Sequence, residues 1–349
     1  LAEYSFRTKE DLEDYLEILE SVPAYLESLA QYEKEKANAG LFMTESDASN
    51  IVKQCDTIMD PDLLSAGEHF LQTTFQERAE ALVQEGLLTG EEMELYIAEN
   101  NRILTTLVAP AYIALADAVF LLSGSGTHEG GLCELPSGGA YYLYLLRHNT
   151  GTSRTPEEIQ VLLSDRFQLC YQNLQALVET YREQTGNTSI SLQDIPAFPF
   201  QDAQEVLADL QQRIQTDFPP LDALTKTLPT CRTKAVAESM EEFTSPAFYL
   251  TPPIDDMGDN VIYVNNASTS PGLELYTTLA HEGYPGHLYQ TVYSQLYENS
   301  RTKNPVRSAL FYGGFVEGWA YYVENISYGY ASDVLLANGA SNITPLLVD

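Results

Sequence analysis

The sequence has few positive charges. Of its 349 residues, 18 are Lys or Arg and 50 are Asp or Glu, so the formal net charge is −32. Nucleic acids and anionic membrane surfaces bind proteins through an excess of Lys and Arg, so we expect neither as a partner. Apolar residues make up 44% of the chain, which is enough to build a hydrophobic core and argues against wholesale disorder.

Long apolar runs and paired cysteines are also absent. A membrane-spanning helix needs about 20 apolar residues, and the longest run, residues 107–122, contains Pro110 and Asp117. The sequence has no signal peptide and does not begin with Met, so we expect that an N-terminal segment has been removed or left out, and the sequence neither shows nor excludes export. The four cysteines include no CxxC pair, which argues against a cysteine-based zinc site. We interpret them as buried free thiols, with one or two disulfides as the alternative.

Most of the chain has apolar residues at helical spacing. The first helix begins after Thr8 and is interrupted at Pro23, and a later helix is kinked at Pro110. Thr155, Pro156 and Glu158 form a strong helix start, with an N-cap, a proline at the first position and a capping box. The predicted later helices cover residues 66–83, 89–122, 155–183, 202–214, 273–297 and 308–330.

Short β-type runs at residues 230–237 and 261–265 interrupt this helical pattern. The predicted fold class is therefore mainly α, with a small β-hairpin or sheet before the helix that carries the main motif. We predict an N-terminal helical region over residues 1–225 and a second region over residues 226–349. One continuous domain is the alternative.

The most informative segment is His281-Glu282-Gly283-Tyr284-Pro285-Gly286-His287. A His-Glu pair on a helix opens the zinc-protease motif HExxH, in which two His four positions apart bind zinc and the Glu activates water. Here the second His follows after six positions, which on a straight helix would place it about 120° around the axis and ~9 Å along it. Because Pro285 and Gly286 disrupt helices, we expect a break that lets the two imidazoles converge.

A candidate third ligand lies thirty residues further along the chain. Glu317 is an acid in an apolar stretch, close to the only Trp, and such a carboxylate must be paired, protonated or metal-bound. Glu324 lies seven positions later on the same helical face, from which it could orient a ligand His.

These residues also have plain structural interpretations. The two His are alternatively core or capping residues, and Glu317 alternatively pairs with an Arg. Spacing alone does not decide between a metal site and these alternatives. We interpret the remaining histidines, His69, His128 and His148, as structural or exposed.

Two segments together carry a family resemblance. HEGYPGHLYQ at residues 281–290 and EGWAYYVE at residues 317–324 resemble the bacterial family called domain of unknown function 885. Similar segments occur at residues 141–159, 245–256 and 260–267, so the resemblance covers about the C-terminal two-thirds of the chain.

The resemblance implies a mainly helical protein related to gluzincin-type zinc metallopeptidases. Carried over to this sequence, it implies one zinc ion, with His281, His287 and Glu317 as ligands and Glu282 as general base. Members are often described as lipoproteins, which implies an extracellular or cell-surface location and a lipid anchor on a removed N-terminal segment. Members usually continue well beyond the second motif, whereas this sequence ends at Asp349. The resemblance therefore leaves open whether the sequence is a fragment that lacks part of the cleft.

Several other residues are candidates for substrate binding. The run at residues 261–265, with Tyr263 and Asn265, is assigned as a strand that holds an extended peptide, or alternatively as an ordinary buried hairpin. The basic cluster of Arg301, Lys303 and Arg307 either receives a substrate carboxylate or, as we favour, pairs with surface acids. The candidate donors to an oxyanion are Tyr284, Tyr289, Tyr312 and Tyr321.

These features predict a zinc-dependent hydrolase, specifically a peptidase whose partner is a peptide substrate. One alternative is a non-catalytic metal- or peptide-binding cell-surface protein that keeps the metallopeptidase fold. The other is a structural helical domain whose His and Glu residues pair with one another.

Overall fold

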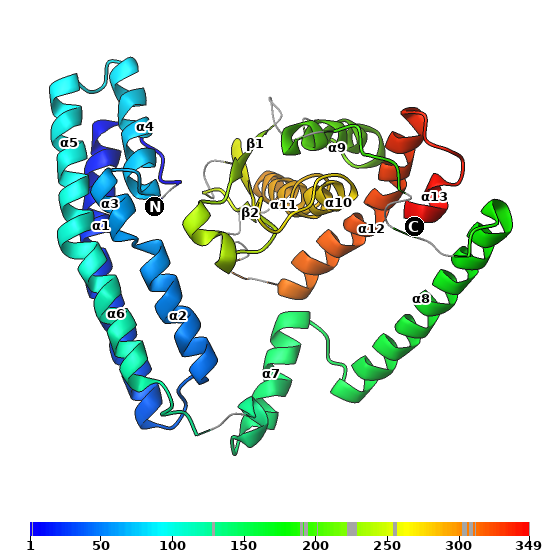
Figure 1. Cartoon of the computed structure of the whole chain (residues 1–349), viewed down its shortest axis with the longest axis horizontal. Coiled ribbons are helices and arrows are strands. Elements are labelled where there is room, and N and C mark those ends of the chain that lie inside the picture. The colour runs from blue at the N-terminus through cyan, green and yellow to red at the C-terminus, as the bar shows by residue number, and fades with distance from the viewer. Residues whose placement is uncertain are drawn as a thin grey trace. The chain divides into compact units, whose positions relative to one another are not determined.

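The computed structural model describes residues 1, 3–127, 130–188, 191, 195–200, 202–221, 229–253, 257–301, 306, 310 and 312–348. Over these residues the fold is mainly helical with a small three-stranded sheet, which confirms the predicted class. The chain forms two compact units, residues 1–136 with 237–243, and residues 137–236 with 244–349 (Figure 1). The boundary predicted at residue 225 falls inside the second unit.

The first unit is helical. It contains α1 (Lys9–Asn38), α2 (Glu45–Ile58), α3 (Pro61–Ala66), α4 (Phe70–Gln84), α5 (Gly90–Ile103), α6 (Ala109–Leu122), and two short 3-10 helices, Gly131–Glu134 and Glu238–Phe243. The Thr8 hydroxyl caps α1 in a capping box with Asp11. The interruption expected at Pro23 is wrong, because α1 continues through it while Leu19 and Leu26 on either side are buried. The sequence patterns did not predict α2 or α3.

The helix from Gly90 to Leu122 contains a local widening. A π-helical turn over Leu104–Val108 joins α5 to α6 just before Pro110, where a kink was expected. Proline has no N–H to offer the preceding turn, and a π turn accommodates that loss without ending the helix. Among the described helices this one is long and apolar enough to cross a membrane, yet Leu104, Val108 and Val119 lie in the cores of the first unit. Core helices of soluble domains have the same properties.

The second unit holds the motif residues. Its helices are α7 (Gly138–Thr150), α8 (Pro156–Thr185), α9 (Ala203–Asp217), α10 (Leu273–Glu282), α11 (His287–Arg301), α12 (Gly313–Ala337) and α13 (Thr344–Val348). Thr155 caps α8 in the predicted capping box. The strands are β1 (Thr230–Ala235), β2 (Ala247–Leu250) and β3 (Asp259–Val264), in the order β1-β3-β2. β3 is parallel to β1 and antiparallel to β2, so it is the central strand.

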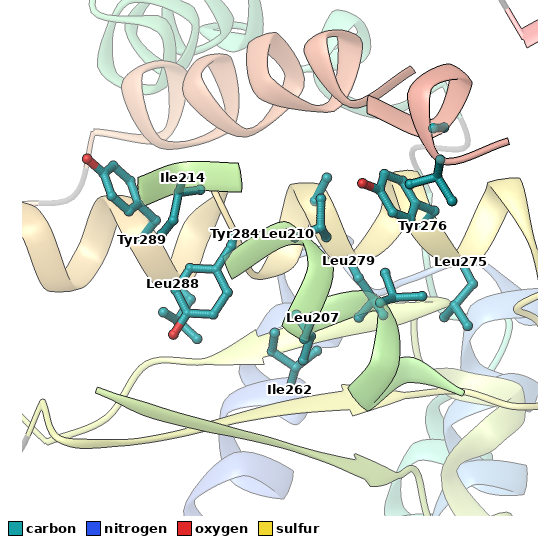
Figure 2. Packing of buried hydrophobic residues seen from close by; sticks show 14 of the residues in the cluster. Leu207, Leu210, Ile214, Ile262, Leu275, Tyr276, Leu279, Tyr284, Leu288 and Tyr289 are labelled. Carbon is teal, nitrogen blue, oxygen red and sulfur yellow. The ribbon is translucent and has the colours of Figure 1, made fainter. Parts of the chain in front are cut away.

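One hydrophobic core connects the sheet to the motif helices. Figure 2 shows Leu207 of α9 beside Ile262 of β3 and near Leu279 of α10, in a cluster that also includes Leu210. Tyr276 on α10 donates a 2.6 Å hydrogen bond to Asp209 of α9. Burial of these side chains therefore fixes α10, the helix that ends in His281 and Glu282, against both α9 and the sheet.

The four cysteines are free thiols. Cys55 is buried as expected, but Cys133 and Cys170 are exposed and Cys231 is partly buried. The interpretation as buried thiols is therefore correct only for Cys55.

Candidate metal centre

The helix carrying the His-Glu pair breaks where the sequence predicted. α10 ends at Glu282 and α11 begins at His287, and the turn between them contains a cis Tyr284–Pro285 peptide bond. Gly286 lies so close to the end of α10 that a Cβ atom there would be 1.7 Å from the His281 carbonyl oxygen. Only glycine fits this position without moving the backbone.

The break brings the two imidazoles together. The ring centroids of His281 and His287 are 4.8 Å apart with their planes at 85°. Donor atoms of His281, Glu282 and His287 lie within 4.8 Å of one another, so this group could hold a metal ion.

Two carboxylates of α12 flank the His281 ring. Glu317 Oε2 lies 3.7 Å from Nε2 of His281 and 3.6 Å from Nε2 of His287. Glu324 Oε2 lies 2.9 Å from Nδ1 of His281, at hydrogen-bond distance. Glu324 therefore contacts a histidine of the motif. Because Nδ1 of His281 is bonded to Glu324, its Nε2 is the nitrogen that faces Nε2 of His287 and Oε2 of Glu317.

Glu282 is held from the sheet. Its Oε2 accepts a 2.8 Å hydrogen bond from the backbone N–H of Tyr249 on β2. Burial raises the pKa of Glu282, an effect that the Tyr249 N–H and His281 oppose and that Glu317 and Glu324 reinforce. Burial, together with the neighbouring His281, lowers the pKa of His287, so its neutral imidazole is favoured.

These groups open into a cleft of about 440 Å³, bounded on one side by β2 and the residues before it. Its lining consists of Ser245, Pro246, Ala247, Phe248, Tyr249, Thr278, His281, Glu282, His287, Glu317 and Glu324. No Lys or Arg occurs among these described lining residues. The polar wall is therefore acidic and histidine-rich.

The strand chosen from the sequence to hold a peptide is the wrong one. β3 is hydrogen-bonded on both sides, to β1 and to β2, so it has no free edge there. Tyr263 stacks on Phe248 at 5.0 Å, and the buried Asn265 donates to the Thr244 carbonyl. The buried-hairpin alternative is closer to the structure, and β2 is the edge strand beside the cleft.

None of the four tyrosines chosen as oxyanion donors lines the cleft. Tyr284 and Tyr289 are buried in the core, and the Tyr289 hydroxyl donates to the Pro219 carbonyl at 2.7 Å. Tyr312 and Tyr321 are exposed, just before α12 and on it.

The side chains of the basic cluster are not among those that the structure describes. Lys303 and Arg307 lie outside the described residues, and for Arg301 the structure describes the backbone only, at the end of α11.

Neither His69 nor His148 is among the residues that line the cleft. His69 is buried and caps α4, while His148 is exposed and stacks on Tyr144. His128 lies outside the described residues.

Sequence patterns missed three contacts at this site. Tyr249 contributes a backbone N–H, which leaves no residue-specific signal. The Trp319 indole N–H donates to the Pro285 carbonyl at 2.7 Å, and the Gln290 amide donates to the Phe315 carbonyl at 3.3 Å. Trp319 and Gln290 lie inside the two motif segments, and this position was the sequence signal that could have pointed to a role at the site.

Comparison with known proteins gives a family match and a similar fold. The model of the family described as "Bacterial protein of unknown function (DUF885)" matches residues 1–339, nearly the whole chain. The crystal structure of the "putative lipoprotein" from Colwellia psychrerythraea is similar, with a TM-score of 0.68 at 19% identity. That match covers 98% of this chain and 58% of the other, so this chain spans little more than half of its length. No curated protein matches this chain.

Proposed function

This chain belongs to the bacterial family of unknown function DUF885, and we propose that it is a zinc-dependent hydrolase, specifically a peptidase of the gluzincin type. The observation that carries the proposal is the convergence of two imidazole Nε2 atoms on one carboxylate oxygen, at 3.7 and 3.6 Å. The three donors come from α10, α11 and α12. The helix break brings the donors of α10 and α11 together, and α12 packs against α10.

The distances from Glu317 to the two imidazoles fit one zinc ion. Zinc binds nitrogen and oxygen at about 2.0–2.2 Å in tetrahedral geometry, so two of its donors are about 3.3–3.6 Å apart. Glu317 Oε2 lies 3.7 and 3.6 Å from the two Nε2 atoms, at or just above the upper end of this range. His281, His287 and Glu317 would therefore hold the ion. A donor set of two imidazoles and one carboxylate favours zinc over calcium, which prefers oxygen ligands alone.

Glu282 is the competing candidate for the third ligand, because its donor atoms also lie near those of the two histidines. Two contacts favour Glu317 instead. Glu317 Oε2 is nearly equidistant from both Nε2 atoms, whereas one Glu282 oxygen is engaged by the Tyr249 N–H. We assign Glu317 as ligand and Glu282 as base.

Bound zinc would supply a Lewis acid that polarises a carbonyl group and lowers the pKa of water towards ~7. Glu282 would take the proton of the attacking water and deliver it to the leaving amine. The Tyr249 N–H fixes the Glu282 carboxylate, and no hydrogen bond to its Oε1 occurs within the described contacts. That oxygen is the one assigned to proton transfer.

We propose that a peptide binds in the cleft as an extended strand. Among the described strands β2 pairs only with β3, and its other edge faces Glu282, which already accepts the Tyr249 N–H. A peptide strand there would use the remaining main-chain groups of that edge. Extended peptides commonly bind to a sheet edge through main-chain hydrogen bonds. This moves the predicted substrate strand from β3 to β2 and keeps the predicted class of substrate.

Two variants test the proposal together with the wild type. Glu282→Gln keeps the side-chain shape and its bond to Tyr249 but removes the base, so zinc content should stay at one per chain. Hydrolysis of a peptide mixture, followed by mass spectrometry, should fall by ~10²–10⁴-fold. His281→Ala should lose zinc and hydrolysis together.

Other results of these measurements would favour one of the two alternative functions or exchange the roles of Glu282 and Glu317. Zinc binding without hydrolysis by the wild type would favour the non-catalytic metal- or peptide-binding protein. Absence of bound metal after purification without chelators would favour the structural domain. If Glu282→Gln loses zinc as His281→Ala does, Glu282 is a ligand and the two roles must be exchanged.

We also propose a location at the cell envelope. The support is the lipoprotein name of the structurally similar Colwellia protein. Recovery of the native protein in the soluble cytoplasmic fraction after cell lysis would contradict this proposal.

A further inference from the structure

Glu317 is positioned almost entirely by its helix. Its side chain is 64% exposed, and its only described contacts with other side chains are those to the two imidazoles. The residue before α12, Tyr312, gives the helix no side-chain cap. The rotation and the axial position of α12 must therefore be set by other contacts, because they decide where the carboxylate lies.

Two hydrogen bonds tie the start of α12 to the segment that carries the histidines. The Trp319 indole N–H donates to the carbonyl of Pro285, inside the turn between His281 and His287, at 2.7 Å. The Gln290 amide, on α11, donates to the carbonyl of Phe315 at 3.3 Å. Phe315 and Trp319 lie two residues before and two residues after Glu317.

The position of Trp319 on the helix explains how its bond controls rotation. Successive residues are 100° apart, so Glu317 and Trp319 project about 160° from each other, from opposite flanks of α12. A rotation that moved Glu317 away from the imidazoles would pull the indole away from Pro285. The Trp319 ring is also partly buried, with Tyr289 stacked at 6.4 Å and Phe218 edge-on at 6.0 Å.

The Gln290 bond acts along the helix axis. Gln290 is 8% exposed and lies one turn into α11, which begins at His287. Its amide holds the first turn of α12 beside the start of α11. A shift of α12 along its axis by one residue, about 1.5 Å, would break this bond.

We propose that Trp319 and Gln290 are positioning residues for the metal site, because together they fix the rotation and the axial position of α12 and so place the Glu317 carboxylate opposite the two histidines. This proposal rests on the proposed metal site but not on hydrolysis. It assigns a physical reason to the joint occurrence of the two motif segments. The first segment supplies the Gln290 amide and the Pro285 carbonyl, and the second supplies the Trp319 indole, with the acceptor carbonyl of Phe315 two residues before Glu317.

The test replaces one hydrogen-bond donor at a time and uses Zn²⁺ and Co²⁺ as probes. Trp319→Phe keeps an aromatic ring and removes the N–H, and Gln290→Met keeps the length and removes the amide. Tyr289→Phe is the matched control, because it removes another 2.7 Å bond to a proline carbonyl, that of Pro219, within the same aromatic cluster. Zinc affinity is measured by competition with a chromophoric chelator, and the visible spectrum of the Co²⁺ protein reports the ligand geometry.

Trp319→Phe should lower zinc affinity by ~10–100-fold, the usual effect of removing a group that orients a ligand, and should change the Co²⁺ spectrum. Gln290→Met should act in the same direction. Tyr289→Phe should leave both readouts at wild-type values, even if it lowers the melting temperature as much. Wild-type affinity and an unchanged spectrum in Trp319→Phe would overturn the proposal.

The outcomes distinguish this proposal from the proposed function. A wild type that binds zinc without hydrolysing peptides overturns the peptidase function, and the affinity readouts still decide the role of Trp319. A wild type that binds neither ion overturns both proposals. Equal losses of zinc affinity in Trp319→Phe and Tyr289→Phe would show a general packing effect and would also overturn the positioning role.

Discussion

Replacing Gly286 by alanine should damage the metal site because of one close backbone approach. A Cβ at this position would lie 1.7 Å from the His281 carbonyl oxygen and 2.4 Å from that of Ala280. Real Cβ atoms essentially never come closer than 3.0 Å to such an atom. The turn must therefore open by about 1.3 Å, and both clashing atoms are backbone atoms that no side-chain rotation can remove.

This displacement is large on the scale of a zinc site, where donor distances vary by about 0.2 Å. Disturbing a group that only orients a ligand costs about 10–100-fold in affinity. Moving His287 itself should cost at least ~100-fold, which is about 2.7 kcal/mol. Strain in the turn should lower the melting temperature as well, since overpacking a fixed site costs about 1–3 kcal/mol.

Gly318 provides the matched control. It lies beside Glu317 on α12, and a Cβ there meets nothing within 4 Å. Gly318→Ala should therefore keep zinc and stabilise the helix by about 0.5–1 kcal/mol. Zinc affinity by chelator competition and thermal unfolding by circular dichroism measure both effects. Wild-type zinc affinity in Gly286→Ala would refute the steric argument, as would an equal loss in Gly318→Ala.

Three further predictions concern Glu324, the acidic cleft and His69. Glu324→Ala should weaken zinc binding by ~10–100-fold without unfolding the protein, because the 2.9 Å bond to Nδ1 of His281 is lost; unchanged affinity in a chelator titration would exclude this role. The net charge of −32 and the carboxylates of the cleft should make acidic peptides react more slowly than basic ones at low salt. The difference should shrink at 0.1 M salt, where the Debye length is ~10 Å, and equal rates at low salt would contradict it. Burial lowers the pKa of His69, which accepts a bond from the Leu71 N–H through Nδ1. As the pH falls, His69 therefore binds a proton in the unfolded state before it does so in the native state. Its contribution to the free energy of unfolding is present above pH ~6.5 and is lost as the pH falls below that value. His69→Asn, which can still cap α4, should lose less of its free energy of unfolding than the wild type between pH 7.5 and 5.5, as measured by urea unfolding. An equal loss in the two proteins would exclude His69 as the group responsible.

Local sequence signals predicted the local features of the fold. The capping box at Thr155 is present because its partner, Glu158, is three residues away. The break between His281 and His287 is present because Pro285 and Gly286 act on their own backbone. The interruption at Pro23 was wrong because tertiary burial of Leu19 and Leu26 outweighs the helix propensity of one residue.

Contacts between distant segments were not predictable in this way. β2 has four residues, too few for a clear alternation, and it is a strand because it pairs with β3. The choice of β3 as the peptide-binding edge failed because the order of strands depends on pairing that no single strand encodes. Tyr284 was one of four candidate oxyanion donors. Its side chain is buried in the core instead, because the neighbouring Gly283 lies against Leu207 and Ile262.

The spacing of the two α12 acids has a clearer meaning in the structure than in the sequence. Glu317 and Glu324 are seven residues apart, which places them on one face of the helix about 10.5 Å apart along its axis. This spacing lets one helix reach both nitrogens of the same imidazole, with Glu324 at Nδ1 and Glu317 near Nε2 of His281. Any slip of α12 against α10 must disturb both contacts together. The orientation of the His281 ring and the position of Glu317 are therefore both set by how α12 packs against α10.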